Sequence, residues 1–218
     1  MGINREILRL AIPSILANIT VPLVGMVDIA VAGHLNTGGM SAAAFIGAIA
    51  VGSMLFDLLY WNFAFLRAGT GGLTAQAYGR GDSAECANVL YRSLATAAAI
   101  SLILIAVQWF FVNLAFLFVK CTPEVRVLAS TYFYIRIWAA PATLGLMALK
   151  GWFIGMQNTV ASMSIDLVVN GVNIIASIVL TIGIPGLWSG IGFPGIALGT
   201  VLAQYSGLLT ALGWLFFK

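Results

Sequence analysis

The chain has 218 residues, of which 61% are hydrophobic and only 8% are charged, whereas about 25% of the residues of an ordinary soluble domain are charged. This composition excludes a soluble globular domain and predicts an all-α, polytopic membrane protein. The formal net charge is +3, but the basic residues are spread over the connecting segments, so they form no nucleic-acid-binding patch.

Six apolar stretches follow one another along the chain, and each is long enough to cross a bilayer, which takes about 20 helical residues. Residues 167–217 contain no charged residue and must hold two of these stretches. The most polar connector is AQAYGRGDSAEC. We therefore expect one six-helix domain, residues 1–218, with membrane spans at about 10–34, 43–66, 88–118, 126–149, 160–182 and 194–217.

The first apolar stretch, LAIPSILANITVPLVGMVDIAVAGHL, contains one carboxylate, Asp28. A charged side chain in hydrocarbon is costly, so Asp28 must face a polar cavity, find a partner or be protonated. The same stretch contains Pro13 and Pro22, and Pro22 leaves the carbonyl of Asn18 without its helical hydrogen bond. The first span is therefore expected to bend at a proline hinge and to face the bundle interior.

Two further charged residues lie within expected spans. Asp57 is in the second, and Arg136 is near the middle of the fourth, one turn before Pro141. Charges in a membrane span commonly pair, so Asp57 and Arg136 could pair with each other or with other groups, or Arg136 could neutralise Asp28. The sequence leaves these alternatives open. Tyr60 is a candidate for the cavity wall, although aromatic side chains in membrane bundles more often pack or anchor at the interface.

Six polar residues of the fifth expected span recur at intervals of three or four, which places them on one helical face. Such a stripe must face the bundle interior or a wet cavity. Its two amides can both donate and accept hydrogen bonds, which suits a carboxyl group whose protonation changes. We expect an ion-coupling cluster of Asp28 with Asn170, Asn173 and Ser177 in the outer half of the membrane, and a structural or interfacial role for Asp166. The full stripe is Ser162, Asp166, Asn170, Asn173, Ser177 and Thr181.

The placement of Lys and Arg predicts the orientation, because cytoplasmic loops carry an excess of both. With the amino terminus inside, only Lys120 and Arg126 fall outside. Both termini are therefore expected on the cytoplasmic side of a bacterial-type inner membrane. The basic residues assigned to the cytoplasmic side are Arg5, Arg9, Arg67, Arg80, Arg92, Lys150 and Lys218.

Motifs of nucleotide, metal or hydrolytic chemistry are missing from the sequence, which has no P-loop, no paired-cysteine site, no HExxH and no serine triad. We therefore expect no enzymatic activity and no organic cofactor or metal. The expected partner of such a chain is the lipid bilayer.

Four stretches resemble the multidrug and toxic compound extrusion (MATE) family, most strongly its DNA-damage-inducible F branch. In collinear order they are AIPSILANITVPLVGMVDIAVAGHL, FLRAGTGGLTAQAYGRGD, YIRIWAAPATLGLMALKGWFIGMQNT and NGVNIIASIVL. Members have twelve spans in two six-helix lobes related by a pseudo-two-fold axis along the membrane normal. This chain resembles the amino-terminal lobe alone, as a truncation, a split gene product or a half that pairs with a second copy.

The resemblance implies a secondary antiporter that exports organic, often cationic compounds. The family's acidic residue of span one matches Asp28, and the proline whose kink accompanies protonation in some members corresponds to Pro22 or Pro13. Many members have aspartate four residues after the position of Asn173, where this chain has Ser177, and this departure favours protons over sodium. The alternatives are an inactive or structural half that needs a second lobe, or a channel or lipid flippase of related fold.

Overall fold

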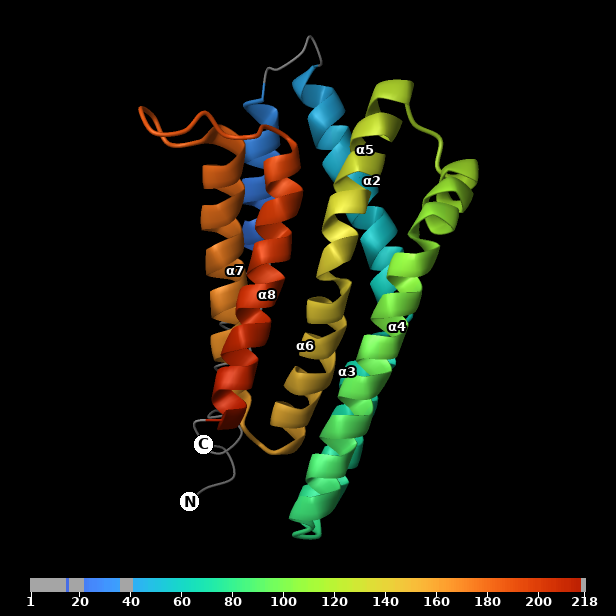
Figure 1. Cartoon of the computed structure of the whole chain (residues 1–218), viewed down its shortest axis with the longest axis vertical. Coiled ribbons are helices and arrows are strands. Elements are labelled where there is room, and N and C mark those ends of the chain that lie inside the picture. Colours follow the sequence, from blue (N-terminus) through green and yellow to red (C-terminus); the bar gives the residue numbers. More distant parts are fainter. Residues whose placement is uncertain (1–14, 16–21, 36–40, 217–218) are drawn as a thin grey trace.

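The computed structural model describes Ile15, residues 22–35 and residues 41–216, and its regular secondary structure in these ranges is helical. Figure 1 shows long helices that run along one common direction. Five helical segments in the described ranges are long and apolar enough to cross a membrane, and the shorter apolar helix Pro22–Gly33 precedes them. The expected all-α membrane bundle is therefore confirmed, whereas Pro13 and the start of the first expected span lie outside the described residues.

The helices extend further than the expected spans. Their bounds are α2 Ala42–Trp61, α3 Ala64–Gly79, α4 Ser83–Phe118, α5 Pro123–Arg136, the 3-10 turn η1 Ile137–Ala139, α6 Ala140–Gly155, α7 Thr159–Ile182 and α8 Pro194–Phe216. Beyond the second expected span, 43–66, helical structure continues through α3 to Gly79. Nine of the twelve residues of the connector AQAYGRGDSAEC are thus helical, five at the end of α3 and four at the start of α4, and its alanines and glutamine are good helix formers.

The break between α2 and α3 has a local cause. The side-chain amide of Asn62 donates a hydrogen bond to the carbonyl oxygen of Leu58 at 2.6 Å, while the backbone N–H of Asn62 turns to the carbonyl of Tyr60. A side chain that takes the place of a backbone donor interrupts the helical ladder. The break between α2 and α3 therefore arises without proline or glycine.

The break between α5 and α6 follows from Pro141, the second residue of α6. Proline lacks an N–H and its ring clashes with the carbonyl four residues earlier, here that of Ile137. The backbone responds with the 3-10 turn η1, in which the N–H of Ala140 bonds to the carbonyl of Ile137. Arg136 is the last residue of α5, so its side chain branches from the main chain at this break.

The bundle packs as neighbouring helix pairs, α7 with α8, α3 with α6 and α2 with α5. Glycines allow two of these pairs to approach closely. A Cβ built on Gly151 of α6 would lie 2.4 Å from the carbonyl oxygen of Arg67 on α3, and one built on Gly199 of α8 would lie 2.7 Å from the backbone nitrogen of Ser177 on α7. Such small-residue contacts drive helix association in lipid, where no hydrophobic force acts between helices.

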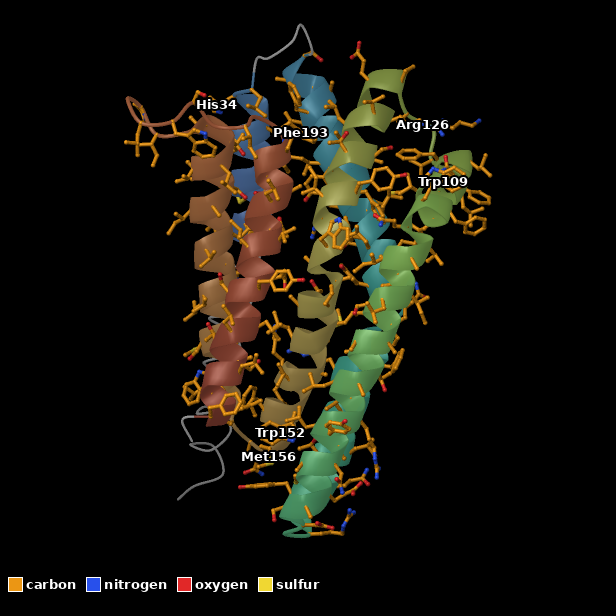
Figure 2. All side chains as sticks on the ribbon, in the orientation of Figure 1. His34, Trp109, Arg126, Trp152, Met156 and Phe193 are labelled. Carbon is orange, nitrogen blue, oxygen red and sulfur yellow. The ribbon has the colours of Figure 1, made fainter. Side chains whose placement is uncertain are left out.

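The two ends of the bundle can be distinguished by their side chains. Figure 2 shows Trp152 and Met156 at the lower end, and His34, Phe193 and Arg126 toward the upper end. The lower end holds the α3–α4 and α6–α7 connections, and the upper end holds the α4–α5 and α7–α8 connections. In the last of these, Gly183 adopts φ +87° as it ends α7, a conformation that glycine adopts without strain.

Candidate functional site

Asp28 lies in the interior of the bundle, with only 6% of its surface exposed. The helix Pro22–Gly33 positions it there because Asp28, Val31 and Ala32 share one buried face, as a spacing of three and four residues requires. On the opposite face, Met26 and Ile29 are 66% and 47% exposed. The sequence prediction that the helix turns its carboxylate inward is therefore confirmed by the position of this side chain.

The Asp28 carboxyl group lies beside Ser177 of α7 and within electrostatic range of Arg136. The two side chains are not hydrogen-bonded to each other. Among the described residues, Oδ1 of Asp28 and Oγ of Ser177 have no hydrogen-bond partner. A buried polar atom without a partner is costly and marks a place where a proton, an ion or water is expected to act. The first and fifth expected spans thus meet at Asp28 and Ser177.

The polar stripe of α7 faces the bundle as predicted. Asn173, Ser177 and Thr181 are at most 3% exposed, and Ser162 is also buried. The apolar positions between them point outward, for example Ile175, which is 65% exposed. Because polar side chains cannot face lipid without cost, this division fixes how α7 is rotated in the bundle.

Asn173 is tied to α8 by a contact that the sequence did not predict. Its Nδ2 donates to Oγ1 of Thr200 at 3.1 Å, and Thr200 in turn donates to the carbonyl of Ile196 at 3.3 Å. Among the described residues, Oδ1 of Asn173 has no hydrogen-bond partner. Asn173 therefore has one amide atom committed to α8 and one acceptor free on the same helical face as Ser177.

Ser177 and Thr181 also form the α7 side of the close α7–α8 packing. A Cβ on Gly199 would lie 2.7 Å from Oγ of Ser177, and one on Gly195 would lie 2.7 Å from Oγ1 of Thr181. Gly195 and Gly199 are four residues apart, which is the small-xxx-small spacing of tightly packed membrane helices. This spacing was the available signal for the α8 contribution to the site.

Arg136 is held by aromatic residues and not by an acidic partner. Its Nη1 donates to the hydroxyl of Tyr132 at 2.9 Å, and its guanidinium lies 4.7 Å from the ring centroid of Phe56 and 5.5 Å from that of Tyr132. Cation–π contacts of this kind stabilise a desolvated arginine. Of the open alternatives, the electrostatic approach of Arg136 to Asp28 occurs, although no direct ion pair joins them in the described part of the chain.

Asp57 does not pair with Arg136: the two ion pairs among the described residues involve other side chains. Asp57 is exposed and lines a groove with Tyr60 and Trp61. The pairing alternative is therefore wrong in this structure, because Phe56, the neighbour of Asp57, takes the place over the guanidinium. Tyr60 also stacks on Phe56 with ring centroids 5.5 Å apart, and its place in a substrate cavity stays a prediction.

Lys150 and Asp166 form an ion pair between α6 and α7, with side chains that are 17% and 23% exposed. They line a second cavity, of about 400 Å³, together with Asn170. Asp166 thus has the structural partner expected for it, whereas Lys150 was expected in a connector. Asn170 lies in this cavity wall on the same helix as Asn173, and its membership of the Asp28 cluster stays a prediction.

Pro22 is the first residue of the described helix Pro22–Gly33, and its side chain is exposed. The described residues do not include the turn that precedes it, and Pro13 lies outside them as well. The hinge role of either proline therefore stays a prediction.

Comparison with known proteins decides the family. The family model described as MatE matches residues 13–179, which is more than half of the chain. The chain belongs to the MATE family. Among curated MATE-like relatives, it is 34% identical to the DNA damage-inducible protein F of Escherichia coli (strain K12) over 209 residues, which are 96% of this chain and 43% of that protein.

Other relatives give the same picture of this MATE chain. It is 28% identical to the probable multidrug resistance protein NorM of Bradyrhizobium diazoefficiens, covering 95% of this chain and 43% of that protein. A solved MOP superfamily transporter from Pyrococcus furiosus superposes with a TM-score of 0.83 at 21% identity, covering 97% of this chain and 44% of that one, so the fold is shared. The chain spans less than half the length of the relatives it matches.

Proposed function

We propose that this integral membrane chain is one lobe of a proton-coupled antiporter that exports small organic compounds. The observation that carries the proposal is the buried Asp28 beside Ser177, with a carboxyl oxygen that has no hydrogen-bond partner among the described residues. A carboxyl group in such a place can bind and release a proton at low cost in rearrangement. Protonation removes a charge from the wall of the bundle and so changes what that wall can bind.

Protons are the favoured coupling ion because the site has one acidic side chain where many family members have two. The α7 position one turn after Asn173 holds Ser177 and not aspartate. Sodium prefers several oxygen ligands, whereas a proton needs one basic oxygen. Exchange of a proton against a substrate therefore requires only that Asp28 be reachable from both sides in turn.

An ion-gradient experiment tests this proposal. The protein is reconstituted in liposomes with a fluorescent organic dye, and dye movement is recorded while either the pH gradient or the sodium gradient is varied and the other is held at zero. We expect dye movement to follow the pH gradient and to stop when a protonophore collapses it. Movement that follows sodium at fixed pH would contradict the proton assignment, and movement without either gradient would favour a channel.

We also infer that a second lobe, either another chain or a second copy, covers the α2–α3 surface. Asp57 and Arg67 are exposed there although both lie in the apolar segment Ala42–Gly79. Exposed charges in a membrane span face protein or a water-filled cavity and not lipid. By contrast, the outward residues of α7 and α8, such as Ile175 and Leu209, are apolar and suit contact with lipid.

Cysteine cross-linking tests the covered surface. The two native cysteines, Cys86 and Cys121, are free and are first replaced by alanine. A cysteine at Trp61, which is 84% exposed, should then form a cross-linked species of higher mass in native membranes, and one at Ile175 should not. Equal cross-linking at both positions would show random collision and would contradict the assignment.

The orientation of the chain in the membrane is proposed from the basic residues near the two ends of the bundle. Arg80 lies in the α3–α4 connection and Lys150 near the carboxyl end of α6, whereas Lys120 lies in the α4–α5 connection and Arg126 in the first turn of α5, at the other end of the bundle. Since basic residues concentrate on the cytoplasmic side, we place the α3–α4 end in the cytoplasm of a bacterial-type inner membrane.

A further inference from the structure

A polar cavity lies between α3, α6, α7 and α8, in the half of the bundle opposite to the α7–α8 loop. It has a volume of about 400 Å³. On α7 its lining ends at Asn170, about one turn before Asn173, and Asp28, Asn173 and Ser177 are not among its lining residues. Its polar lining residues are Arg67, Thr143, Lys150, Asp166, Asn170 and Gln204.

Two basic side chains converge on this cavity because their backbones cross. The contact of Gly151 with the carbonyl of Arg67 brings α3 and α6 together at this level, and Lys150, the neighbour of Gly151, comes within electrostatic range of Arg67. Two like charges in proximity repel each other, more strongly where water is scarce. The fold therefore holds the two cations together against a cost, and such an arrangement in a cavity marks a candidate functional site.

The carboxylate of Asp166 balances only one of these two positive charges. It accepts a hydrogen bond from Nζ of Lys150, and an ammonium group has three donors, so two remain for a ligand. Arg67 has no ion-pair partner in the part of the chain that the structure describes. The lining thus has one net positive charge and a planar guanidinium that suits bidentate binding of carboxylate or phosphate.

The cavity continues into an apolar groove. The two share Ala64 and Met147, and the groove is otherwise lined mainly by Met54, Leu58 and Trp61, with Asp57 and Tyr60 as its polar members. Its volume is about 550 Å³. A ligand that fills both spaces needs a charged group at one end and an apolar body at the other.

We propose that this cavity binds the anionic headgroup, a carboxylate or a phosphate, of an amphiphile whose apolar part lies along the α2–α3 groove, between this lobe and the second lobe that covers the α2–α3 surface. Arg67 and Lys150 bind the headgroup, and Gln204 and Asn170 line the space around it. Asp166 competes with the ligand for Lys150 and so limits its affinity. An anionic amphiphile belongs to a substrate class different from the cations implied by the family resemblance. That this ligand is exported rests on the proposed function.

Equilibrium binding without any ion gradient separates this proposal from transport. The protein is placed in phosphatidylcholine nanodiscs and titrated with the anionic probe dansylaminoundecanoate, whose fluorescence rises in an apolar site. We expect saturable binding that is displaced by dodecyl phosphate and not by dodecyltrimethylammonium. Equal displacement by the cation would overturn the proposal, even if proton-coupled export of other compounds were found.

Four variants assign the binding to this cavity. Arg67→Gln should weaken probe binding about tenfold or more, because it removes a charge-assisted hydrogen bond. The double variant Lys150→Gln with Asp166→Asn removes both members of the ion pair, so no buried charge is left alone, and should also weaken it. Asp166→Asn alone should strengthen binding, since it frees the ammonium group. The control is Arg92→Gln, since this side chain is 72% exposed on α4, and it should change nothing.

The sign of the Asp166→Asn effect is decisive. If the ion pair with Lys150 only stabilises the bundle, Asp166→Asn weakens binding or leaves it unchanged, and the proposal is overturned. The source of the natural ligand is determined by measuring probe binding in nanodiscs that contain phosphatidylglycerol. Loss of probe binding there, relative to phosphatidylcholine, identifies a lipid headgroup as occupant, whereas unchanged binding identifies a free amphiphile, and both results support an anion site.

Discussion

Replacing Asp28 by asparagine should strongly slow pH-driven dye movement while leaving the protein folded. Asparagine has nearly the same shape and can still lie beside Ser177, but it cannot bind and release a proton in the relevant range. A coupling free energy between ion and substrate amounts to about 5–150-fold in affinity, and we expect the pH-driven rate to fall by a factor in that range. The measurement is the initial rate of dye movement in liposomes under a fixed pH gradient.

The thermal stability of Asp28→Asn should not fall with its transport rate. The Asp28 carboxyl group has an oxygen without a hydrogen-bond partner among the described residues, and any time spent ionised in this interior is costly. Asp28→Asn removes that cost, so the midpoint of thermal unfolding in detergent should rise or stay constant. A residue with a purely structural role would show the reverse, namely lower stability together with lost transport.

The matched control is Asp57→Asn, the same chemical change at a carboxylate of α2 that is exposed and does not approach Arg136 as an ion pair. It should leave the dependence on pH intact. If Asp57→Asn slows pH-driven movement as strongly as Asp28→Asn, the assignment of the coupling proton to Asp28 is wrong. Asp28→Glu completes the set, because it keeps a titratable group and should retain part of the activity.

The sequence was sufficient to predict the position of Asp28 and the polar stripe. Both follow from one constraint, that charged and amide side chains within a membrane span face protein and not lipid. Spacings of three and four then select the face of each helix without knowledge of its neighbours. This is why the burial of Asp28, Asn173 and Ser177 could be predicted residue by residue.

Contacts between helices could not be predicted in the same way. The hydrogen bond from Asn173 to Thr200 depends on how α7 and α8 pair, and neither helix alone indicates it. Lys150 was assigned to a connector because the apolar run ends at Leu149, yet α6 continues to Gly155. Its partner Asp166 neutralises the charge, so the helix extends beyond the point where hydropathy alone would end it.

The breaks within the helices could likewise be predicted only in part from the sequence. Pro141 could be recognised as a breaker from its missing N–H, and the 3-10 turn η1 lies directly before it. The break at Asn62 depends on one side-chain hydrogen bond to Leu58, which competes with the backbone and leaves no composition signal. Asparagine is common in continuous helices as well, so this residue alone did not indicate where α2 ends.

The close crossing of α3 and α6 leads to the second large expected effect. Replacing Gly151 by alanine should destabilise the bundle by about 1–3 kcal/mol, the usual range for forcing extra atoms into a packed core. The added Cβ would lie 2.4 Å from the carbonyl oxygen of Arg67, and since that atom belongs to backbone, a whole helix must move to relieve the clash. The measurement is the midpoint of thermal unfolding in detergent, which should fall.

The control uses the same substitution where there is room. No atom lies within 4 Å of a Cβ built on Gly171 in the described structure, and Gly171 is in the middle of α7. Alanine favours a helix over glycine by up to about 1 kcal/mol, so Gly171→Ala should leave the midpoint unchanged or raise it. Because the α3–α6 crossing also places Arg67 beside Lys150, Gly151→Ala should weaken dansylaminoundecanoate binding as well. If Gly151→Ala and Gly171→Ala shift the midpoint equally, this crossing does not determine the stability of the lobe.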